Sequence, residues 1–313
     1  MTGVARAPVS ASPGRLARRR FLAHRPAVAS AVLLAVMGTA VLAAPLVIAA
    51  LDLDPEAVDL FARYEPPSAG HPLGRDELGR DVLARLLLGG RVSLGVGLVT
   101  ALVVAVIGTA LGLVAGWRGG RVDQVLMRFT DAVIALPLLP LLIVLAALDP
   151  AKLGLPPEVA RSEALAFWRI VVIVSLVGWT TVARLVRAAT LAAREQEYVR
   201  AARALGAGPW RIVLRHILPN IASPIVVATT LSVGHVILFE SVLSFLGLGI
   251  QPPLPSWGNM LTGAQETIRE APMLAIWPGL LIFLTVIAFN FLGDGLQDAL
   301  DPRARSVARG SRV

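Results

Sequence analysis

The chain has 313 residues, of which 56% are apolar and only 16% are charged. Its mean hydropathy of +0.71 indicates an integral membrane protein, since about a quarter of the residues in soluble domains are charged. The lack of cysteine excludes a disulfide framework, a thiolate metal site and a cysteine nucleophile. The net charge of +8 is carried by basic residues at the ends of apolar runs, which favours a topology signal over nucleic-acid binding.

Six apolar segments are long enough for a membrane-crossing helix, which needs about 20 residues. They cover residues 27–50, 93–117, 125–148, 167–190, 221–249 and 273–295. Pro137 and Pro140 interrupt the third segment, and Arg169 and Trp179 interrupt the fourth, so five spans are the alternative to six. The sequence therefore predicts an all-α integral membrane protein with six transmembrane helices.

The distribution of basic residues predicts the orientation. With the N-terminus inside, the inner segments carry 20 of the 29 Lys and Arg residues; they are 1–26, 118–128, 184–215 and 296–313. The longest outer segment, 51–92, contains eight Asp and Glu. This asymmetry follows the positive-inside rule. We therefore expect a multi-pass protein of the bacterial plasma (inner) membrane, with both termini in the cytoplasm.

This topology divides the chain into a basic cytoplasmic tail over 1–26, a transmembrane domain over 27–295 and a second cytoplasmic tail over 296–313. Residues 1–20, rich in Arg, Ala, Ser and Pro, are expected to be disordered. The run R-R-R-F-L at residues 18–22 resembles a twin-arginine export signal. Because a full span and further spans follow it, we interpret this run as the basic flank of the first span.

The outer segment 51–92 contains a pattern typical of a short amphipathic helix. Asp76 is placed to cap its N-terminus, Asp81 precedes Arg85 at the favourable four-residue spacing, and Gly89-Gly90 is expected to end it. The residues of its apolar face are Leu78, Val82, Leu83, Leu86 and Leu87. Such a helix either covers the bundle as a lid or contacts a partner.

The most informative stretch is an arginine-rich insert between the fourth and fifth spans, residues 197–219. Residues 198–205 are helix formers with apolar positions at three-residue steps, and Gly206-Ala207-Gly208 breaks the helix. Pro209 suits the first turn of a second helix, and Pro219 is expected to end it. Trp210, Val213 and Leu214 form the predicted apolar stripe, flanked by Arg211 and Arg215. The sequence predicts two short helices that form a rigid cytoplasmic knob.

This insert resembles the EAA loop of permease subunits in ABC importers, whose pattern is E-A-A, three residues, Gly, nine residues and I-x-L-P. The alanines fall at Ala201 and Ala202, the glycine at Gly206, and the terminal L-P at Leu218 and Pro219. Arg200 stands where the family has Glu, so the acidic contact of that position is not carried over.

Three further blocks resemble the dipeptide/oligopeptide/nickel permease group, and more narrowly its C-type subunit. They are H-P-L-G-R-D-E-L-G-R-D-V-L-A-R from His71, S-F-L-G-L-G-I-Q-P-P-L-P-S-W-G-N-M from Ser244, and F-N-F-L-G-D-G-L-Q-D-A-L-D-P-R from Phe289. The resemblance covers about residues 18–305. It implies a type I ABC importer permease fold with a cytoplasmic coupling loop over 191–220. Di- or oligopeptides are the favoured substrates, with nickel or another small solute as the alternative.

The resemblance also implies partners and a coupling site. The partners are a second, B-type permease, two ATPase subunits, an extracytoplasmic substrate-binding protein and the lipid bilayer. In the family a helix corresponding to residues 207–215 sits in a groove of the ATPase. The coupling residues implied here are Ala201, Ala202, Gly206, Ala207, Gly208, Pro209, Trp210, Arg211, Val213, Leu214, Arg215 and Pro219.

Missing motifs shape the functional prediction. Lys152 is the only lysine, and no G-x-x-x-x-G-K-[ST] surrounds it, so this chain forms no P-loop. We expect a non-catalytic subunit without a cofactor, with ATP and magnesium bound by the partner ATPases. The four histidines show no metal-ligand spacing, and we interpret each as a cap or an interfacial residue.

Polar residues inside the spans give the last candidate site. Glu240 is the only acidic residue well inside an apolar span, and a carboxyl group there should face a cavity or a partner. It either lines the translocation path or forms a bond between helices or to the other permease. Arg184 and Arg187 are predicted to anchor the topology. No internal repeat supports the rival prediction of a secondary transporter, and no catalytic constellation supports a membrane-embedded enzyme.

Overall fold

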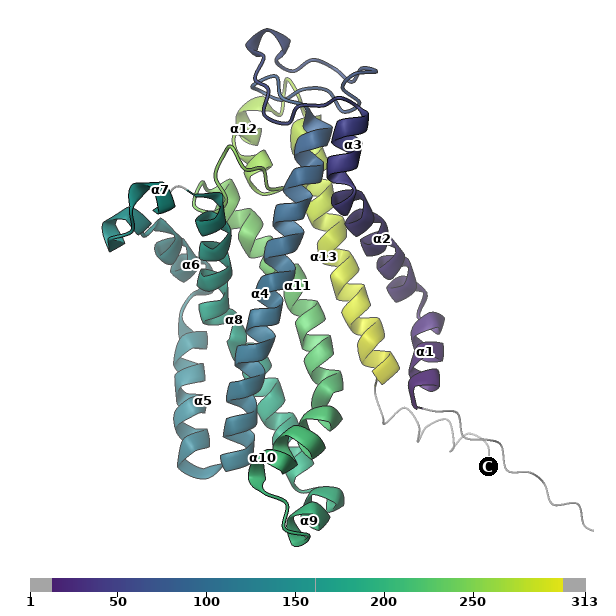
Figure 1. Ribbon diagram of the computed structural model, residues 1–313, viewed down its shortest axis with the longest axis vertical. Helices are drawn as coiled ribbons and strands as arrows, with labels where there is room; N and C mark the ends of the chain where they lie inside the picture. Colours follow the sequence, from purple (N-terminus) through teal and green to yellow (C-terminus); the bar gives the residue numbers. More distant parts are fainter. Residues whose placement is uncertain (1–12, 161, 301–313) are drawn as a thin grey trace, which may run out of the picture.

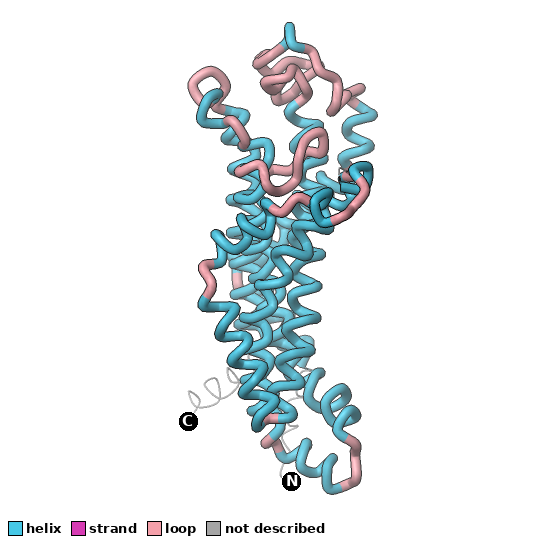
Figure 2. The backbone as a smooth tube through the Cα atoms, turned by 90° about the vertical axis from the view of Figure 1, so that its left-hand side faces the viewer, coloured by secondary structure: helices cyan, strands magenta, loops and turns pink. Residues whose placement is uncertain are grey.

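The computed structural model describes residues 13–160 and 162–300 (Figure 1). Helix is the only repeating secondary structure in these ranges, which contain no strand. The long helices share one direction, and most of the irregular chain gathers at one end, here called the loop end (Figures 1 and 2). The short helices α9 and α10 lie at the opposite end, here called the insert end.

Five helical segments of the described chain are long and apolar enough to cross a bilayer. They are α2 (Arg25–Leu42), α4 (Val82–Arg118), α8 (Glu163–Arg194), the continuous stretch Pro209–Phe245 and α13 (Met273–Leu300). A sixth span exists only as α5 (Gly120–Ala135) followed by α6 (Leu138–Ala147), bent by 83°. Leu136, before Pro137, is extended (φ −73°, ψ 136°), as the proline ring requires. The predicted third span is therefore broken at its first proline.

The N-terminal region is more ordered than predicted. Residues 1–12 lie outside the described residues, but α1 spans Pro13–Ala23, so the prediction of disorder is wrong for residues 13–20. α1 and α2 pack against α13, where Ala27 leaves no room for a side chain at Gly295. The Ala27 amide donates to His24 Nδ1 over 3.2 Å and so caps α2. Composition alone does not reveal this packing partner.

The predicted separate helix between residues 76 and 90 is wrong. Asp81 caps the helix instead of Asp76, since its Oδ1 accepts the Ala84 amide at 2.7 Å, and α4 begins at Val82. Gly89 and Gly90 do not end the helix, which continues to Arg118. Their missing side chains admit the segment around Trp257: a Cβ at Gly90 would lie 2.9 Å from the Trp257 ring. Tertiary packing overrides the helix-breaking tendency of the pair.

Glycines also bring α4 and α8 together. Gly108, Gly112 and Gly116 follow one another at four-residue steps on α4, and an added Cβ at each would come within 3 Å of α8. Small residues at this spacing allow the close backbone approach on which packing in lipid depends. The two longest single helices thus form the central pair of the bundle.

Short elements complete the described chain. They are α3 (Ala44–Ala50), η1 (Leu60–Ala62), η2 (Pro150–Leu153), α7 (Pro157–Ala160), η5 (Asn259–Leu261) and α12 (Ala264–Thr267). Apolar side chains more than half exposed occur along the long helices; they include Val32, Val36, Leu98, Leu102, Val106, Val172, Leu176 and Phe283. An apolar outer surface of this kind fits a lipid environment.

Candidate functional site

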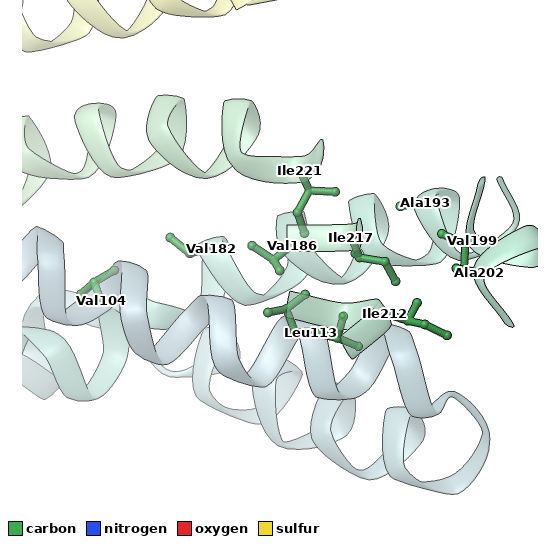
Figure 3. Close-up of a cluster of buried hydrophobic side chains, with 11 residues drawn as sticks. Val104, Leu113, Val182, Val186, Ala193, Val199, Ala202, Ile212, Ile217 and Ile221 are labelled. Atoms are coloured by element: carbon green, nitrogen blue, oxygen red, sulfur yellow. The ribbon is translucent and has the colours of Figure 1, made fainter. Parts of the chain in front are cut away.

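The insert begins with α9 (Glu197–Ala204), which packs one face on the bundle. Val199 and Ala202 are buried in a cluster with side chains of α4 and α8, including Leu113 and Val186 (Figure 3). Leu205, the next apolar position of the predicted pattern, is 88% exposed. The three-residue pattern therefore predicts burial correctly at Val199 and Ala202 and wrongly at Leu205.

Gly206 ends α9 as predicted. Its φ of +79° lies in the left-handed region, its amide donates to Arg203 O, and the Ala207 amide donates to Ala202 O, both over 3.0 Å. This pair of bonds is the Schellman arrangement, which favours glycine. A Cβ added at this position would meet no atom of the described residues within 4 Å, so the requirement for glycine is conformational and not steric.

The second helix starts at Pro209 as predicted but does not end at Pro219. α10 (Pro209–Ile212) continues through the π turn Val213–Ile217 (η3) and the 3-10 turn Leu218–Ile221 (η4) into α11 (Ala222–Phe245). The altered hydrogen-bond pattern of these two turns accommodates a proline without breaking the helical path. The insert is consequently joined to the fifth span as one helical rod.

The predicted stripe of the second helix is only partly buried. Ile212, Val213 and Ile217 face the cluster of Figure 3, whereas Trp210 is 71% exposed and Leu214 is 55% exposed. With Leu205, these two side chains give the insert an exposed apolar surface. Arg211 and Arg215 are also exposed. An exposed apolar patch edged by arginine is typical of a protein-binding surface.

The other predicted coupling residues are mostly exposed on the insert. Ala207 is half-buried and Ala202 is buried; the exposed ones are Ala201, Gly206, Gly208, Pro209 and Pro219. Arg200, at the position that departs from the family pattern, is exposed too. In the structure this segment of the chain lies at the insert end of the bundle (Figure 1).

Arginines connect the elements that support the insert. Arg194 Nη1 donates to the carbonyl oxygens of Gly116 and Trp117 at the end of α4, each over 3.3 Å. The Arg203 guanidinium lies 5.3 Å from the centre of the Trp117 ring. These contacts hold the ends of α4, α8 and α9 together.

Arg184 and Arg187, predicted as topology anchors, form ion pairs with α5. Arg187 bonds both carboxyl oxygens of Asp123, with Nη2 2.6 Å from Oδ2, and Arg184 pairs with Asp131. Prediction from the sequence missed both aspartates. Their eight-residue spacing on α5 places them on one helical face, which was the available signal.

Glu240 is enclosed within the bundle. It is 0% exposed, and it accepts hydroxyl protons from Ser93 of α4 (3.0 Å) and from Ser244 of α11 (2.7 Å). The hydrogen bond from Ser93 joins α4 to α11, and such a bond between helices was one of the alternatives that the sequence left open for Glu240. Placement on a translocation path stays a prediction.

A cavity of about 830 Å³ lies between the α5–α6 break, α8 and α11. Its lining is mainly apolar, with polar groups from Thr180, Ser232 and His235 among others. Val236 and Phe239, which precede Glu240 on α11, reach the lining, whereas Glu240 does not. Within the described ranges no group of three or more His, Cys, Asp and Glu side chains could hold a metal ion.

Comparisons with known families match most of the chain. Residues 108–306 match the family described as the binding-protein-dependent transport system inner membrane component. Residues 12–67 match the N-terminal transmembrane domain of oligopeptide transport permease C. Together the two matches include both the insert and the N-terminal helices.

Curated relatives agree with these matches. The glutathione transport system permease protein GsiD of Pectobacterium atrosepticum is 44% identical over 77% of this chain and 76% of its own length. A putative peptide permease protein of Brucella ovis is 40% identical over 95% of this chain and 93% of its own. The dipeptide transport system permease protein DppC of Bacillus subtilis is 44% identical over 77% and 71%.

The fold has a solved counterpart. An inward-facing structure of the MetNI methionine ABC transporter contains a chain that matches with a TM-score of 0.54 and 20% identity. The match covers 69% of this chain and 96% of that one, so the shared fold is that of a type I importer permease. The chain described here belongs to the family of inner membrane components of binding-protein-dependent ABC transport systems.

Proposed function

We propose that this chain is a translocation-pathway subunit of an ATP-driven importer for di- or oligopeptides, and that residues 197–219 couple it to ATP hydrolysis. The observation that best supports this proposal is the structure of the insert. Val199, Ile212 and Val213 pack α9 and the start of the following helical rod against the bundle, yet Trp210 and Leu214 remain exposed. A stable, exposed apolar surface at the end of a membrane bundle needs a partner.

Separate ATPase subunits are the partners that fit this surface. The sequence has no P-loop, so ATP and magnesium bind to two ATPases, and this subunit is non-catalytic. Trp210 and Leu214 enter the groove of an ATPase, while Arg211 and Arg215 pair with acidic groups at its edge. Tryptophan and arginine are the residues that most often dominate binding energy at such contacts.

A second, B-type permease completes the translocation path. The cavity of about 830 Å³ beside the α5–α6 break is lined by Val133, Thr180 and His235 among others. Its mostly apolar lining with a few polar groups is typical of a small-molecule site. We place the path along this cavity, enclosed by the second permease on the side that this chain leaves open.

The insert end faces the cytoplasm in this proposal. α1 and the end of α13 lie toward the same end of the bundle as α9 (Figure 1), and the basic residues concentrate in those segments. The loop end then faces outward, where an extracytoplasmic binding protein delivers substrate to segments 51–81 and 246–272. Both termini are cytoplasmic in this orientation.

Peptides are the favoured substrates because relatives over most of the chain are named as dipeptide, peptide or glutathione permeases. Nickel or another small solute is the alternative. The two are separated by measuring which ligand, presented by the cognate binding protein, stimulates ATP hydrolysis by the complex in proteoliposomes.

The coupling role is tested by Trp210→Glu and Leu214→Glu in the assembled complex. Both side chains are exposed, so membrane insertion and yield should remain those of the parent, while co-purification of the ATPase and substrate uptake are lost. Trp210→Phe is the matched control, since it keeps an apolar ring and should keep uptake. Val213→Glu is different: Val213 is buried, and this variant should fail to fold.

Parental uptake in Trp210→Glu and Leu214→Glu would refute the coupling role. Uptake by this chain alone, without ATP or partner subunits, would instead support a secondary transporter and refute the whole proposal.

A further inference from the structure

Glu240 stands at the centre of a buried network at the loop end of α11. Its Oε2 accepts the hydroxyl proton of Ser93 on α4 over 3.0 Å, and its Oε1 accepts that of Ser244 over 2.7 Å. All three side chains are buried. A carboxyl group withdrawn from water in this way needs such donors, because burial without them is costly.

The two serines connect Glu240 to the segment that follows α11, residues 246–262. Ser93 Oγ accepts the Trp257 amide over 3.1 Å, and Ser244 Oγ accepts the Ile250 amide over 3.0 Å. Each hydroxyl oxygen therefore accepts one hydrogen bond from a backbone amide of the segment and donates its own hydrogen bond to Glu240. Only a carboxyl group offers two oxygens that both accept, so an amide at this position satisfies only one serine in the same geometry.

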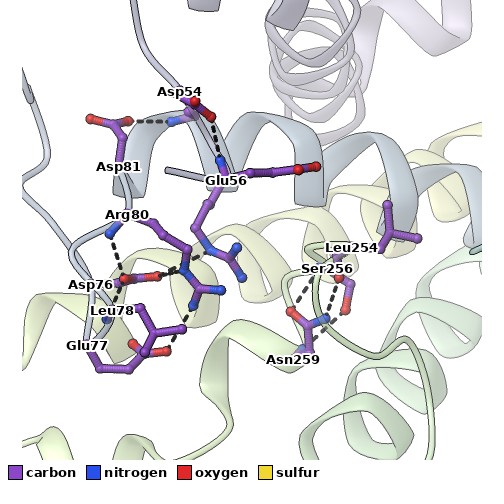
Figure 4. Close-up of polar contacts among 12 residues, drawn as sticks. Asp54, Glu56, Asp76, Glu77, Leu78, Arg80, Asp81, Leu254, Ser256 and Asn259 are labelled. Atoms are coloured by element: carbon purple, nitrogen blue, oxygen red, sulfur yellow. Dashed lines mark hydrogen bonds and ion pairs between the residues drawn. The ribbon is translucent and has the colours of Figure 1, made fainter. Parts of the chain in front are cut away.

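The segment is held against the helices by close packing as well. A Cβ at Gly258 would lie 2.6 Å from Ser241 Cα, so this position approaches α11 directly. The Trp257 side chain is buried, and its Nε1 donates to Leu86 O of α4 over 2.9 Å. Within the segment the Asn259 side chain bonds the Ser256 amide and the Leu254 carbonyl (Figure 4). Residues 246–262 thus form a folded cap and not a loose loop.

The same helical rod joins this cap to the insert. The stretch Pro209–Phe245 is continuous, with Ile212 and Val213 in the buried cluster at one end and Glu240 in the network near the other. Rigid secondary elements with fixed contacts at both ends are the parts that carry coupling between distant sites. A displacement of α10 would therefore reach the cap through α11.

We propose that Glu240 is a positioning residue that fixes the cap 246–262 to the rod 209–245 and to α4, so that the insert and the cap move as one body. Through it the outer surface that receives the loaded binding protein is linked to the surface that receives the ATPase. This inference rests on the function proposed above. It gives Glu240 a role in transmission and not in substrate contact.

The first test is stimulation of ATP hydrolysis by ligand-loaded binding protein, measured on the assembled complex in proteoliposomes. Glu240→Gln should lower the stimulation by about fivefold or more, the scale of an ordinary allosteric coupling, and leave unstimulated hydrolysis at the parental rate. Ser93→Ala, which removes one bridging hydroxyl and no charge, should lower it in the same direction. Ser175→Ala on α8 is the matched control, because this buried hydroxyl has no hydrogen-bond partner among the described residues and lies outside the Glu240 network; it should keep full stimulation.

The second test uses spin labels at Gln251→Cys and Glu197→Cys, both exposed positions in a chain without native cysteine. In the parent the distance between the labels should stay narrow and constant with and without nucleotide. In Glu240→Gln the distribution should broaden.

A narrow distribution in that variant, or parental stimulation in both Glu240→Gln and Ser93→Ala, would overturn this inference alone. If Glu240→Gln does not assemble, Ser93→Ala decides by the same two readouts. A parental complex without ATP-dependent uptake would instead overturn the proposed function.

Discussion

The insert end and the loop end of this bundle are held together by different interactions. At the insert end α9 and α10 sit on an apolar cluster that includes Val186, Val199 and Ile217. At the loop end the irregular chain is held by buried polar groups, by glycines and by Trp257. At the insert end one apolar surface stays exposed. At the loop end the polar groups and the Trp257 side chain that hold the irregular chain are buried.

Asp76 illustrates how the loop end is organised. Its carboxylate, buried beside Arg85, accepts the Leu78 and Arg80 amides and the Arg80 Nε over 2.8–3.0 Å (Figure 4). His71 lies between Asp81 Oδ2 (2.9 Å) and Arg75 Nη2 (2.7 Å). Because arginine only donates, His71 Nε2 accepts a hydrogen bond from Arg75 and Nδ1–H donates one to Asp81. Each group here has a fixed donor or acceptor role.

The difference concerns tolerance to substitution. Apolar contacts have no direction, so the insert end should accept changes that keep volume and backbone conformation. A buried polar network loses the full desolvation cost of any group that is left unpaired. We therefore expect the loop end to be the more sensitive of the two, and the following predictions test that ranking.

The largest effect is expected for Gly258→Val. The new Cβ would lie 2.6 Å from Ser241 Cα and 2.8 Å from Ser241 O, and these backbone atoms cannot rotate away. Overpacking of this kind should lower the free energy of unfolding by about 3 kcal/mol, measured by titration with denaturing detergent in mixed micelles. Gly279→Val on α13 is the control, since no atom in the described part of the chain lies within 4 Å of its Cβ position. Equal effects in the two variants would contradict the close approach.

A smaller loss is expected for Asp81→Ala, which removes the cap of α4 and the partner of His71. The Ala84 amide and His71 Nδ1 each lose an acceptor, which should cost about 1–3 kcal/mol. Hydrogen exchange should report this as faster exchange at the first turn of α4. Asp54→Ala is the control, because Asp54 is exposed and, among the described residues, bonds only the nearby Glu56 and Ala57 amides. Unchanged exchange at Ala84 in Asp81→Ala would show that another group caps the helix.

Gly206→Val at the insert end should have an effect of about 1–2 kcal/mol, the cost of a left-handed conformation for a residue with a side chain. Open space surrounds its Cβ position, so Gly206→Asn, which tolerates this conformation, should retain most of the stability. The pair distinguishes backbone strain from steric conflict by the same detergent titration. Equal losses for Val and Asn would show that the insert end depends on steric fit after all.

Local rules predicted the insert end well because its key residues act through the backbone. Gly206 ends a helix by its conformation and Pro209 begins one by its missing amide, and neither depends on distant residues. The exposure of the apolar side chains on the second helix was harder to predict. Trp210 and Leu214 follow the helical apolar pattern of a buried stripe, yet they face outward, because a surface that binds a partner has the same pattern as one that binds the core.

At the loop end the same rules failed for physical reasons. Gly89 and Gly90 have the composition of a helix end, but the packing of Trp257 keeps them inside α4. Asp76 has the position of a cap, but its carboxylate binds a turn and Arg80. The partners of Glu240 are 147 residues away at Ser93 and one turn away at Ser244. The pairing with Ser93 follows from the fold and has no local signature, whereas the one-turn spacing of Ser244 is a local signal.

The smallest effect concerns charge pairing at the insert end, at the ion pair of Arg187 and Asp123. The side chains are 33% and 13% exposed, so water screens the pair, and its coupling energy should be about 0.2–1 kcal/mol in a double-mutant cycle of Arg187→Gln and Asp123→Asn. The cycle is measured by the same detergent titration. Arg184 and Asp131, both about half exposed, supply the matched control cycle, for which we expect the smaller coupling. A coupling energy of about 3 kcal/mol for Arg187 and Asp123 would mean that buried charge pairing holds the insert end too, and the contrast between the two ends would then fail.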